Sequence, residues 1–222
     1  MDFEDRRDAG RQLGKELARH DMNDPVVFGL ARGGVPVAYE VASQLGAPLD
    51  ILVVRKIGAP SNPEYALGAV AEDDVTILDD ASVERFGASH DIGDIVARAR
   101  EELQRRIAQY RGGRPPTSVE GRTAVIVDDG IATGRSAIAA VRAARRRTAE
   151  RVIVAAPVGA PRSIEQVGEE ADEVVCLSAP RMFFAVGAYY RDFGQTSDDE
   201  VVELLREASA RLNQRGEAGR VA

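Results

Sequence analysis

Short apolar runs alternate with stretches of helical spacing along most of this chain. Each run is continuously apolar, which is typical of strands covered on both faces, and each intervening stretch carries apolar or small residues three or four positions apart. This order predicts an α/β fold built on a doubly wound parallel sheet of about five strands. Strands are expected at residues 26–30, 49–54, 123–127, 152–155 and 173–177, and helices at 35–45, 136–147 and 161–170, after an opening helix striped by Ala9, Leu13 and Leu17.

A further pair of apolar runs interrupts this alternation. Residues 66–71 and 75–78 flank three consecutive acidic residues, a pattern that predicts an inserted hairpin. A charged helix is expected next, at about 92–110, and the glycines and prolines of 112–116 end it. We therefore expect an insertion at about 79–116 between strands of the parallel sheet.

The chain of 222 residues is long enough for one domain with a substantial core, which we expect over residues 1–212, ahead of a polar, flexible tail at 213–222. Its formal net charge of -7 argues against a surface built for nucleic-acid phosphates. No apolar stretch approaches the ~20 residues that a membrane helix needs. We expect a cytoplasmic protein without nucleic-acid or membrane partners.

Two adjacent carboxylates, Asp128 and Asp129, follow the apolar run 123–127 directly. Neighbouring like charges repel and need a cation or hydrogen-bond donors, so they are poor core residues. Because ligands of open parallel sheets bind beyond the carboxyl ends of the strands, this position predicts a binding site. The residues that follow are small or polar and lead into a helix, which suits a phosphate. They are Gly130, Ala132, Thr133, Gly134, Arg135 and Ser136.

Together, the acid pair and the loop predict a site for a sugar phosphate. The loop would bind the phosphate, while Asp128 and Asp129 would accept hydrogen bonds from two ribose hydroxyls or hold a bridging Mg²⁺. The alternative is a solvated turn.

Another acidic pair, Asp79 and Asp80, also ends an apolar run, but no phosphate loop follows it. We interpret that pair as a turn in which Asp80 or Ser82 caps a short helix.

The first two predicted strands also end in groups that suit anions. Arg32, Gly33 and Gly34 follow the first strand, and the two glycines let backbone amides approach an anion closely. Arg55 and Lys56 follow the second strand. These two cations can face a phosphate or, alternatively, lie on the surface beside a linker.

Aromatic residues make up only 5% of the chain, yet they concentrate in residues 181–193. Flat apolar rings stack well on a nitrogenous base, so this region predicts a base-binding surface. For any single ring, an aromatic core cluster is the alternative. The candidates are Phe183, Phe184, Val186, Tyr189 and Asp192.

The segment 125–136, VIVDDGIATGRS, resembles the binding motif for 5-phosphoribosyl 1-diphosphate (PRPP) of type I phosphoribosyltransferases. Strand, acid pair, Thr-Gly-x-Ser and helix all occur in register. The resemblance implies the fold of that family, with residues 32–34 as the diphosphate-binding loop after a cis peptide at Ala31–Arg32. Arg55 and Lys56 resemble the pair that precedes the mobile catalytic loop of orotate phosphoribosyltransferases, which implies such a loop at 57–64.

The resemblance also implies an activity. The chain would transfer the 5-phosphoribosyl group of PRPP to a nitrogenous base, a purine being one candidate, and release diphosphate. The implied catalytic residues are Lys56, Arg55, Asp128 and Asp129, and the two aspartates would hold Mg²⁺ together with PRPP. The alternative is a non-catalytic sensor of PRPP or a nucleotide, and a homodimer is possible.

The C-terminal region, about residues 178–197, is similar to the hood of hypoxanthine-guanine phosphoribosyltransferases. That hood has an aromatic residue, a Val-Gly step and a downstream Asp before an Arg-Asp pair. In this chain the Asp-Tyr step that follows Val-Gly in that family is absent, and Tyr189-Tyr190 stands in its place. This departure leaves the identity of the base open.

Overall fold

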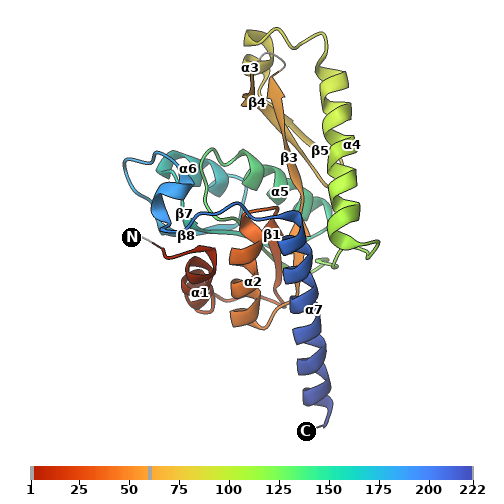
Figure 1. The fold of residues 1–222 in the computed structure, drawn as a ribbon, viewed down its shortest axis with the longest axis vertical. Coiled ribbons are helices and arrows are strands. Elements are labelled where there is room, and N and C mark those ends of the chain that lie inside the picture. Colours follow the sequence, from red (N-terminus) through yellow and green to blue (C-terminus); the bar gives the residue numbers. More distant parts are fainter. Residues whose placement is uncertain (1–2, 60–61, 222) are drawn as a thin grey trace.

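The computed structural model describes residues 3–59 and 62–221, without the side chains at 63, 64 and 215–221. A five-stranded parallel sheet in the order β2-β1-β6-β7-β8 forms its centre (Figure 1). This order confirms the doubly wound arrangement, because the chain runs from β1 to one edge of the sheet and then crosses to build the other side. The strands are β1 (Val26–Leu30), β2 (Leu49–Leu52), β6 (Thr123–Val127), β7 (Arg151–Val158) and β8 (Glu173–Ser178).

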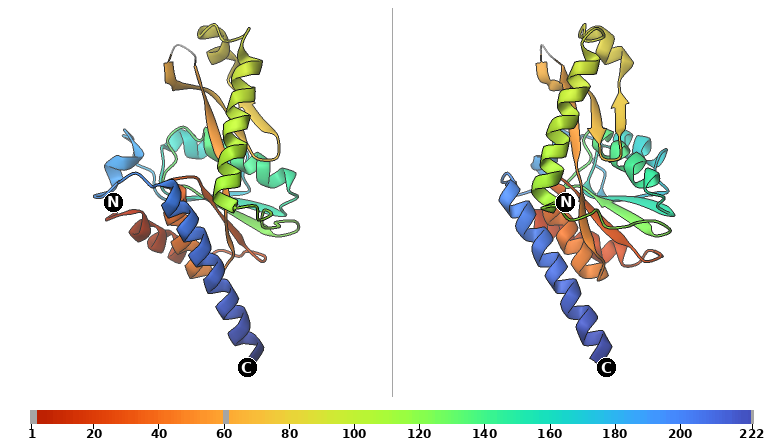
Figure 2. Two further views of the ribbon diagram at one scale, coloured as in Figure 1. Left: turned by 45° about the vertical axis from the view of Figure 1, so that its right-hand side comes forward. Right: turned by 90° about the vertical axis from the view of Figure 1, so that its right-hand side faces the viewer.

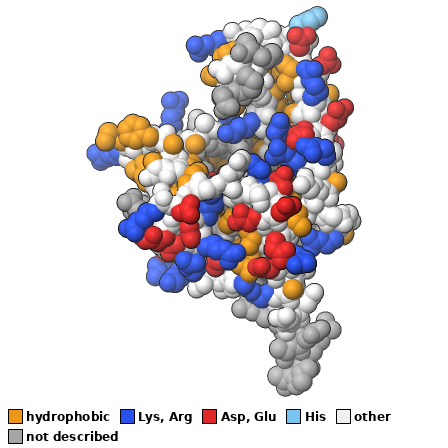
Figure 3. Space-filling model, viewed as in Figure 1, with side chains coloured by type: hydrophobic (Ala, Val, Ile, Leu, Met, Phe, Trp, Pro, Cys, Tyr) orange, Lys and Arg blue, Asp and Glu red, His pale blue; other side chains and the backbone are white. Residues whose placement is uncertain are grey.

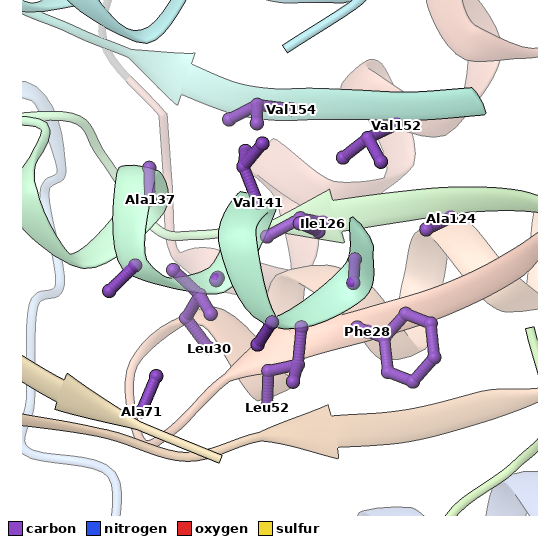
Figure 4. Packing of buried hydrophobic residues seen from close by; sticks show 14 of the residues in the cluster. Phe28, Leu30, Leu52, Ala71, Ala124, Ile126, Ala137, Val141, Val152 and Val154 are labelled. Atoms are coloured by element: carbon purple, nitrogen blue, oxygen red, sulfur yellow. The ribbon is translucent and has the colours of Figure 1, made fainter. Parts of the chain in front are cut away.

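Helices cover both faces of this sheet (Figure 2). Alternate residues of each strand supply the two cores. Val27 and Val125 pack on the side of α1 and α2, whereas Phe28 and Ile126 pack on the side of α5, where small alanines let the helix approach closely (Figure 4). Burial on both faces explains why the strands are continuously apolar. The helices are α1 (Arg6–Leu17) and α2 (Gly34–Leu45) on one face, and α5 (Arg135–Arg146) and α6 (Pro161–Gly168) on the other.

A second, antiparallel sheet continues from the carboxyl end of β2. It has the order β3-β4-β5 and carries two helices, and we call residues 54–111 the arm (Figure 1). The predicted hairpin is present as β4 and β5, and β3 adds a third strand. The elements of the arm are β3 (Val54–Ala59), β4 (Asn62–Ala71), β5 (Val75–Leu78), α3 (Asp80–Arg85) and α4 (Ile92–Arg111).

The expectation of a loop at 57–64 is wrong for the residues that the structure describes. Residues 57–59 end β3 and residues 62–64 begin β4, while Pro60 and Ser61 lie outside the described residues. Ile57 and Ala59 are buried in one apolar cluster with Leu67 and Leu103. Burial of these side chains favours strand pairing over an open loop.

The first and last parts of the chain complete the fold. The Phe3 N–H donates to the Tyr189 carbonyl at 2.8 Å, so the N-terminal segment pairs with the hood, which contains the short helix η1 (Val186–Tyr189). The last helix, α7 (Asp198–Val221), buries Val201 and Leu205 against α2 and α4. Residues 213–221, expected as a flexible tail, continue this helix. Among the described helices, none combines the length and apolar character that a bilayer crossing requires.

Candidate functional site

The acid pair lies at the carboxyl end of β6, as predicted. The Asp128 N–H donates to the Ala155 carbonyl of β7 at 3.2 Å, and the Asp129 N–H donates to Asp128 Oδ1 at 2.9 Å. Burial raises the pKa of Asp128, and the neighbouring charge of Asp129 raises it further. Burial also raises the pKa of Asp129. Both carboxylates are therefore costly to ionise in the protein alone. Hydroxyl groups that donate hydrogen bonds, or a bound cation, would stabilise their charged forms, so the pair suits a ligand of either kind.

Two residues outside the predicted set hold Asp129. Arg6 Nε donates to Asp129 Oδ2 at 2.8 Å, and the Tyr190 hydroxyl donates to the Asp129 carbonyl at 2.6 Å. The guanidinium of Arg6 lowers the pKa of Asp129 against the larger effect of burial. Arg6 is 123 positions away along the chain, and no spacing signals such a contact. One feature of the sequence does single out Tyr190. It belongs to the Tyr189-Tyr190 step that stands where the hood of hypoxanthine-guanine phosphoribosyltransferases has Asp-Tyr.

The loop after β1 packs directly against the acid pair. The Ala31–Arg32 peptide is cis, as the resemblance implies. A Cβ atom at Gly33 would lie 2.1 Å from Asp129 Oδ2, and one at Gly34 would lie 2.5 Å from the Val127 carbonyl oxygen. Only glycine fits at these two positions, so the backbone of the loop comes close to the carboxylates.

The side chain of Arg32 is oriented from the C-terminal part of the chain. Its Nη1 lies 3.7 Å from Asp198 Oδ1 in the first turn of α7. The same carboxylate oxygen accepts a hydrogen bond from the Tyr110 hydroxyl at 2.5 Å. Burial, together with this bond to Asp198, raises the pKa of Tyr110 to about 12, so the hydroxyl stays protonated as a donor. Asp198 and Tyr110 are further residues that the sequence did not reveal.

The phosphate loop, residues 130–134, leads into the N-terminus of α5. Gly134 adopts a φ of +73°, and a Cβ atom there would lie 3.0 Å from Val167 Cγ2 on α6. Ser163 Oγ donates to the Ala132 carbonyl at 2.7 Å. These contacts fix the loop against α6. The first N–H groups of α5 and the hydroxyls of Thr133 and Ser136 therefore offer donors for an anion.

Arg135, which is also part of the predicted phosphate site, turns its guanidinium toward the arm. Its Nη1 donates to the Ala66 carbonyl at 2.6 Å, and Nη2 forms an ion pair with Asp79. With the side chain held there, Arg135 can serve the phosphate site through its backbone N–H. Asp79 also corrects the predicted cap of α3, because the Ser82 N–H donates to Asp79 Oδ1 at 3.2 Å and neither Asp80 nor Ser82 is the capping residue.

The predicted cations lie on β3 of the arm, next to the loops of the parallel sheet. A cleft of about 620 Å³ is lined by Arg55 and Lys56 together with Ala31 and Ser136. A second groove, of about 930 Å³, contains Lys56 beside residues 132–133. Lys56 therefore adjoins both the phosphate loop and the loop that follows β1, residues 31–34, which we call the glycine loop. Figure 3 shows Lys and Arg side chains gathered where the arm meets the rest of the molecule.

The predicted base-binding residues of the hood differ in how close they lie to the acid pair and in how exposed they are. A Cβ atom at Gly130 would lie 2.5 Å from Val186 Cγ1, so Val186 covers the residue that follows the acid pair. The rings of Phe183 and Tyr189 are stacked, with centroids 5.7 Å apart and planes 18° from parallel. The remaining two candidates, Phe184 and Asp192, are exposed.

The acid pair fits Mg²⁺ as part of a larger ligand set. Mg²⁺ prefers octahedral oxygen ligands and usually binds through one or two carboxylates, substrate phosphates and waters. Within residues 3–59 and 62–221, no group of three or more His, Cys, Asp or Glu side chains forms a candidate metal site. Asp128 and Asp129 could therefore hold the ion only together with oxygen atoms of a bound phosphate compound or water.

Known proteins show what this chain is similar to. Residues 4–193 match the family model described as phosphoribosyl transferase domain. The Mycobacterium tuberculosis H37Rv protein named "Putative phosphoribosyl transferase Rv0571c" is 52% identical over 207 residues, which cover 93% of this chain and 47% of that protein. The chain thus spans about half the length of the curated relatives it matches.

Solved structures share the fold of this chain. The crystal structure of TT1426 from Thermus thermophilus is 46% identical, with a TM-score of 0.79 over 93% of this chain and 99% of that one. The AQ2163 protein from Aquifex aeolicus, at 13% identity and a TM-score of 0.50 over 78% of this chain and 74% of that one, shares the fold. The family match spans the acid pair, the loop after β1 and the phosphate loop, and the chain therefore belongs to the phosphoribosyl transferase family.

Proposed function

We propose that this chain transfers the 5-phosphoribosyl group of PRPP to a nitrogen atom of a base and releases diphosphate. The observation that carries the proposal is the convergence of four groups at one edge of the sheet. These are the acid pair, the glycine loop after β1, the phosphate loop before α5 and the cations of β3. Together the four groups match the three parts of PRPP, which are its 5-phosphate, its ribose and its diphosphate.

The assignment of each group follows from its chemistry. The N–H groups at the start of α5, with the hydroxyls of Thr133 and Ser136, would bind the 5-phosphate. The carboxylates of the acid pair accept hydrogen bonds, so they would bind the ribose hydroxyls. The diphosphate would lie toward Arg32 and the backbone of the glycine loop, because amides and a guanidinium both favour anions.

In the reaction, the bond between the anomeric carbon and a diphosphate oxygen breaks as a bond to the base nitrogen forms. That nitrogen loses its proton to solvent. Positive charge develops on the sugar in the transition state, beside Asp128 and Asp129, and negative charge develops on the departing diphosphate beside Arg55 and Lys56. Mg²⁺ bound with PRPP would supply further positive charge to the diphosphate. The chain thus needs no covalent nucleophile.

The hood supports a place for the base. Val186 lies over the residue after the acid pair, and the stacked rings of Phe183 and Tyr189 lie in the same short segment. Apolar and aromatic surface of this kind suits a flat heterocycle. A purine is one candidate for that base.

The proposal is tested by incubating the protein with PRPP, Mg²⁺ and a panel of purines, pyrimidines and related bases while diphosphate release is measured. We expect release with at least one base, and loss of that release in Lys56→Ala but not in Lys15→Ala, which removes an exposed lysine of α1. PRPP binding without turnover of any base would contradict the transferase and favour the sensor. Absence of PRPP binding would contradict both.

A further inference from the structure

Arg135, the first residue of α5, joins the end of the phosphate loop to the arm. Its guanidinium donates to the Ala66 carbonyl at 2.6 Å and forms an ion pair with Asp79. All hydrogen bonds that the described residues form between 128–136 and the arm come from this side chain. Arg135 therefore supplies the polar contact between the two regions.

Both acceptors of Arg135 are held within the arm itself. The Asp79 N–H donates to the Leu67 carbonyl at 2.8 Å, which joins Asp79 to the residue that follows Ala66. The hydrogen bond from the Ser82 N–H and the guanidinium of Arg135 lower the pKa of Asp79, so its carboxylate is ionised at neutral pH. A planar guanidinium that meets a carboxylate and a carbonyl together has a defined orientation.

Lys56 lies near this contact along the sheet of the arm. It pairs with Ala69 across β3 and β4, and Gly58, two residues further on, pairs with Ala66. Side chains directly opposite one another on antiparallel strands share a face, and Ala69 packs in the core cluster that includes α5. Lys56 therefore lies on the α5 face of the arm. It lines the same groove of about 930 Å³ as Arg135.

The direction of the Lys56 side chain depends on the strand that carries it. Within the described part of the chain, no residue is hydrogen-bonded or ion-paired to its ammonium group, and the side chain is exposed. Burial and Asp129 raise the pKa of Asp128, and the charge of Lys56 opposes them, so Lys56 is within electrostatic reach of the acid pair. A shift of β3 would move this cation relative to a bound ligand.

We infer, on the basis of the proposed function, that Arg135 is a positioning residue for Lys56. The backbone of Arg135 belongs to the turn that would bind the 5-phosphate of PRPP. Its side chain holds β4, which pairs with the strand of Lys56. The contact thus sets the distance between the phosphate loop and the cation that faces the departing diphosphate.

The test compares kcat and PRPP affinity in Arg135→Met, which keeps a long side chain and removes its donors. Since a small displacement of a catalytic group slows the reaction, kcat should fall about tenfold. The dissociation constant of PRPP should change less than about twofold. In a Lys56→Ala background the same substitution should lower kcat no further, because the two residues act as one unit. Arg135→Lys, which keeps a donor for the Ala66 carbonyl, should recover part of the loss.

Two further variants sharpen the comparison. Asp79→Asn keeps an oxygen for the Ser82 N–H but removes the ion pair, so it should show the pattern of Arg135→Met more weakly. Arg142→Met is the control. Arg142 also extends from α5 into the groove, but it pairs with Glu170 rather than with the arm, and its loss should leave kcat unchanged.

Equal losses of kcat from Arg135→Met in the parent and in the Lys56→Ala background would overturn the inference. A loss of PRPP affinity as large as the loss of kcat would also overturn it, because the guanidinium would then act on the ligand itself.

Amide hydrogen exchange provides a measurement that does not depend on turnover. Residues 54–59 should exchange at least about threefold faster in Arg135→Met than in the parent, and no faster in Arg142→Met. Unchanged exchange in Arg135→Met would overturn the positioning role. A parent protein that turns over no base contradicts the proposed function, and the exchange of residues 54–59 then still decides whether Arg135 holds the strand of Lys56.

Discussion

The edge of the parallel sheet and the arm bring groups to the same site in different ways. The acid pair, the glycine loop and the phosphate loop continue from strands that are buried on both faces, and close contacts fix their backbones. Arg55 and Lys56 come from an antiparallel strand of the arm, where Arg55 is half-buried and Lys56 is exposed. A rigid edge suits recognition of a ligand, whereas exposed cations suit charge that develops only during the reaction.

The two regions also differ in what stabilises them. Glycine packing fixes the sheet edge, while buried ion pairs hold the base of the arm. Arg111, which ends α4, donates to Glu72 Oε2 at 2.5 Å and to the Ile51 carbonyl of β2 at 2.9 Å. Arg147, which follows α5, donates to the same Glu72 oxygen at 2.8 Å. Charges buried in this way are costly to leave without a partner.

The largest effect is expected from breaking the base of the arm. Glu72→Ala would remove the carboxylate that Arg111 and Arg147 share and leave them with Asp50 and Asp73 as partners. Loss of one partner from a buried pair lowers the free energy of unfolding by about 3–5 kcal/mol, and the remaining carboxylates make this the upper bound of the expected loss. Urea denaturation measures this loss. Glu102→Ala, which removes a partly exposed partner of Arg105 and Arg106 on α4, is the matched control and should change the stability little. Similar results for the two variants would mean that the arm is held in another way.

The next largest effect concerns the arm's contribution to the reaction. Lys56→Ala should lower kcat on the order of a hundredfold, because a cation beside departing diphosphate acts mainly in the transition state. The dissociation constant of PRPP should change much less. Turnover and PRPP affinity are measured side by side, and equal losses in the two quantities would show that Lys56 binds the ground state as strongly as the transition state.

At the edge of the parallel sheet we expect a large change in PRPP affinity, in contrast to Lys56. Replacing both Asp128 and Asp129 with Asn should weaken PRPP binding at least tenfold, since charge-assisted hydrogen bonds contribute about 1.5–3 kcal/mol each. The fold should persist, because removal of two adjacent, largely buried charges relieves their repulsion, and an amide oxygen at position 129 can still accept the hydrogen bond from Arg6. Calorimetry and a thermal melt check the two statements, and an unchanged PRPP affinity in a folded double variant would remove the acid pair from the binding site.

The smallest effect is expected at the phosphate loop. Ser136→Ala removes one hydroxyl beside several backbone donors, so the affinity for ribose 5-phosphate should fall only a few-fold, in line with about 0.5–1.5 kcal/mol for one hydrogen bond. Gly134→Glu is the stringent companion variant, because its side chain would meet Val167 and place a negative charge beside the anion. If Gly134→Glu binds ribose 5-phosphate as well as the parent, the phosphate lies elsewhere.

The parallel sheet could be predicted because its strands are buried on both faces and therefore continuously apolar. The expected bounds of the strands at 26–30 and 123–127 coincide with β1 and β6. The strand β3 was missed because Gly58 and Pro60 are typical of a loop. In the structure, Ile57 and Ala59 gain enough burial on the arm to form a strand despite that local preference.

The site was predictable where its residues follow one another along the chain. The acid pair and the phosphate loop form a continuous motif, and the structure places them together. Arg6 could not be predicted, because its partner is 123 positions away and one arginine among many carries no pattern. The same holds for Glu72 and Arg111, which pair across 39 positions.

The pairing of the N-terminal segment with the hood has a consequence for synthesis. Arg6 and its acceptor at Gly194 are 188 positions apart, and Glu4 and Arg191 are 187 apart. At about 5–20 residues per second, the ribosome needs roughly 10–40 s to supply these partners. Throughout that interval the ring of Phe3 lacks Tyr190, on which it packs with centroids 5.5 Å apart, and its N–H lacks the Tyr189 carbonyl. A nascent chain that already contains the acid pair and the phosphate loop thus still lacks the contacts of Glu4 and Arg6 with the hood, which form only after residues 191–194 have been made.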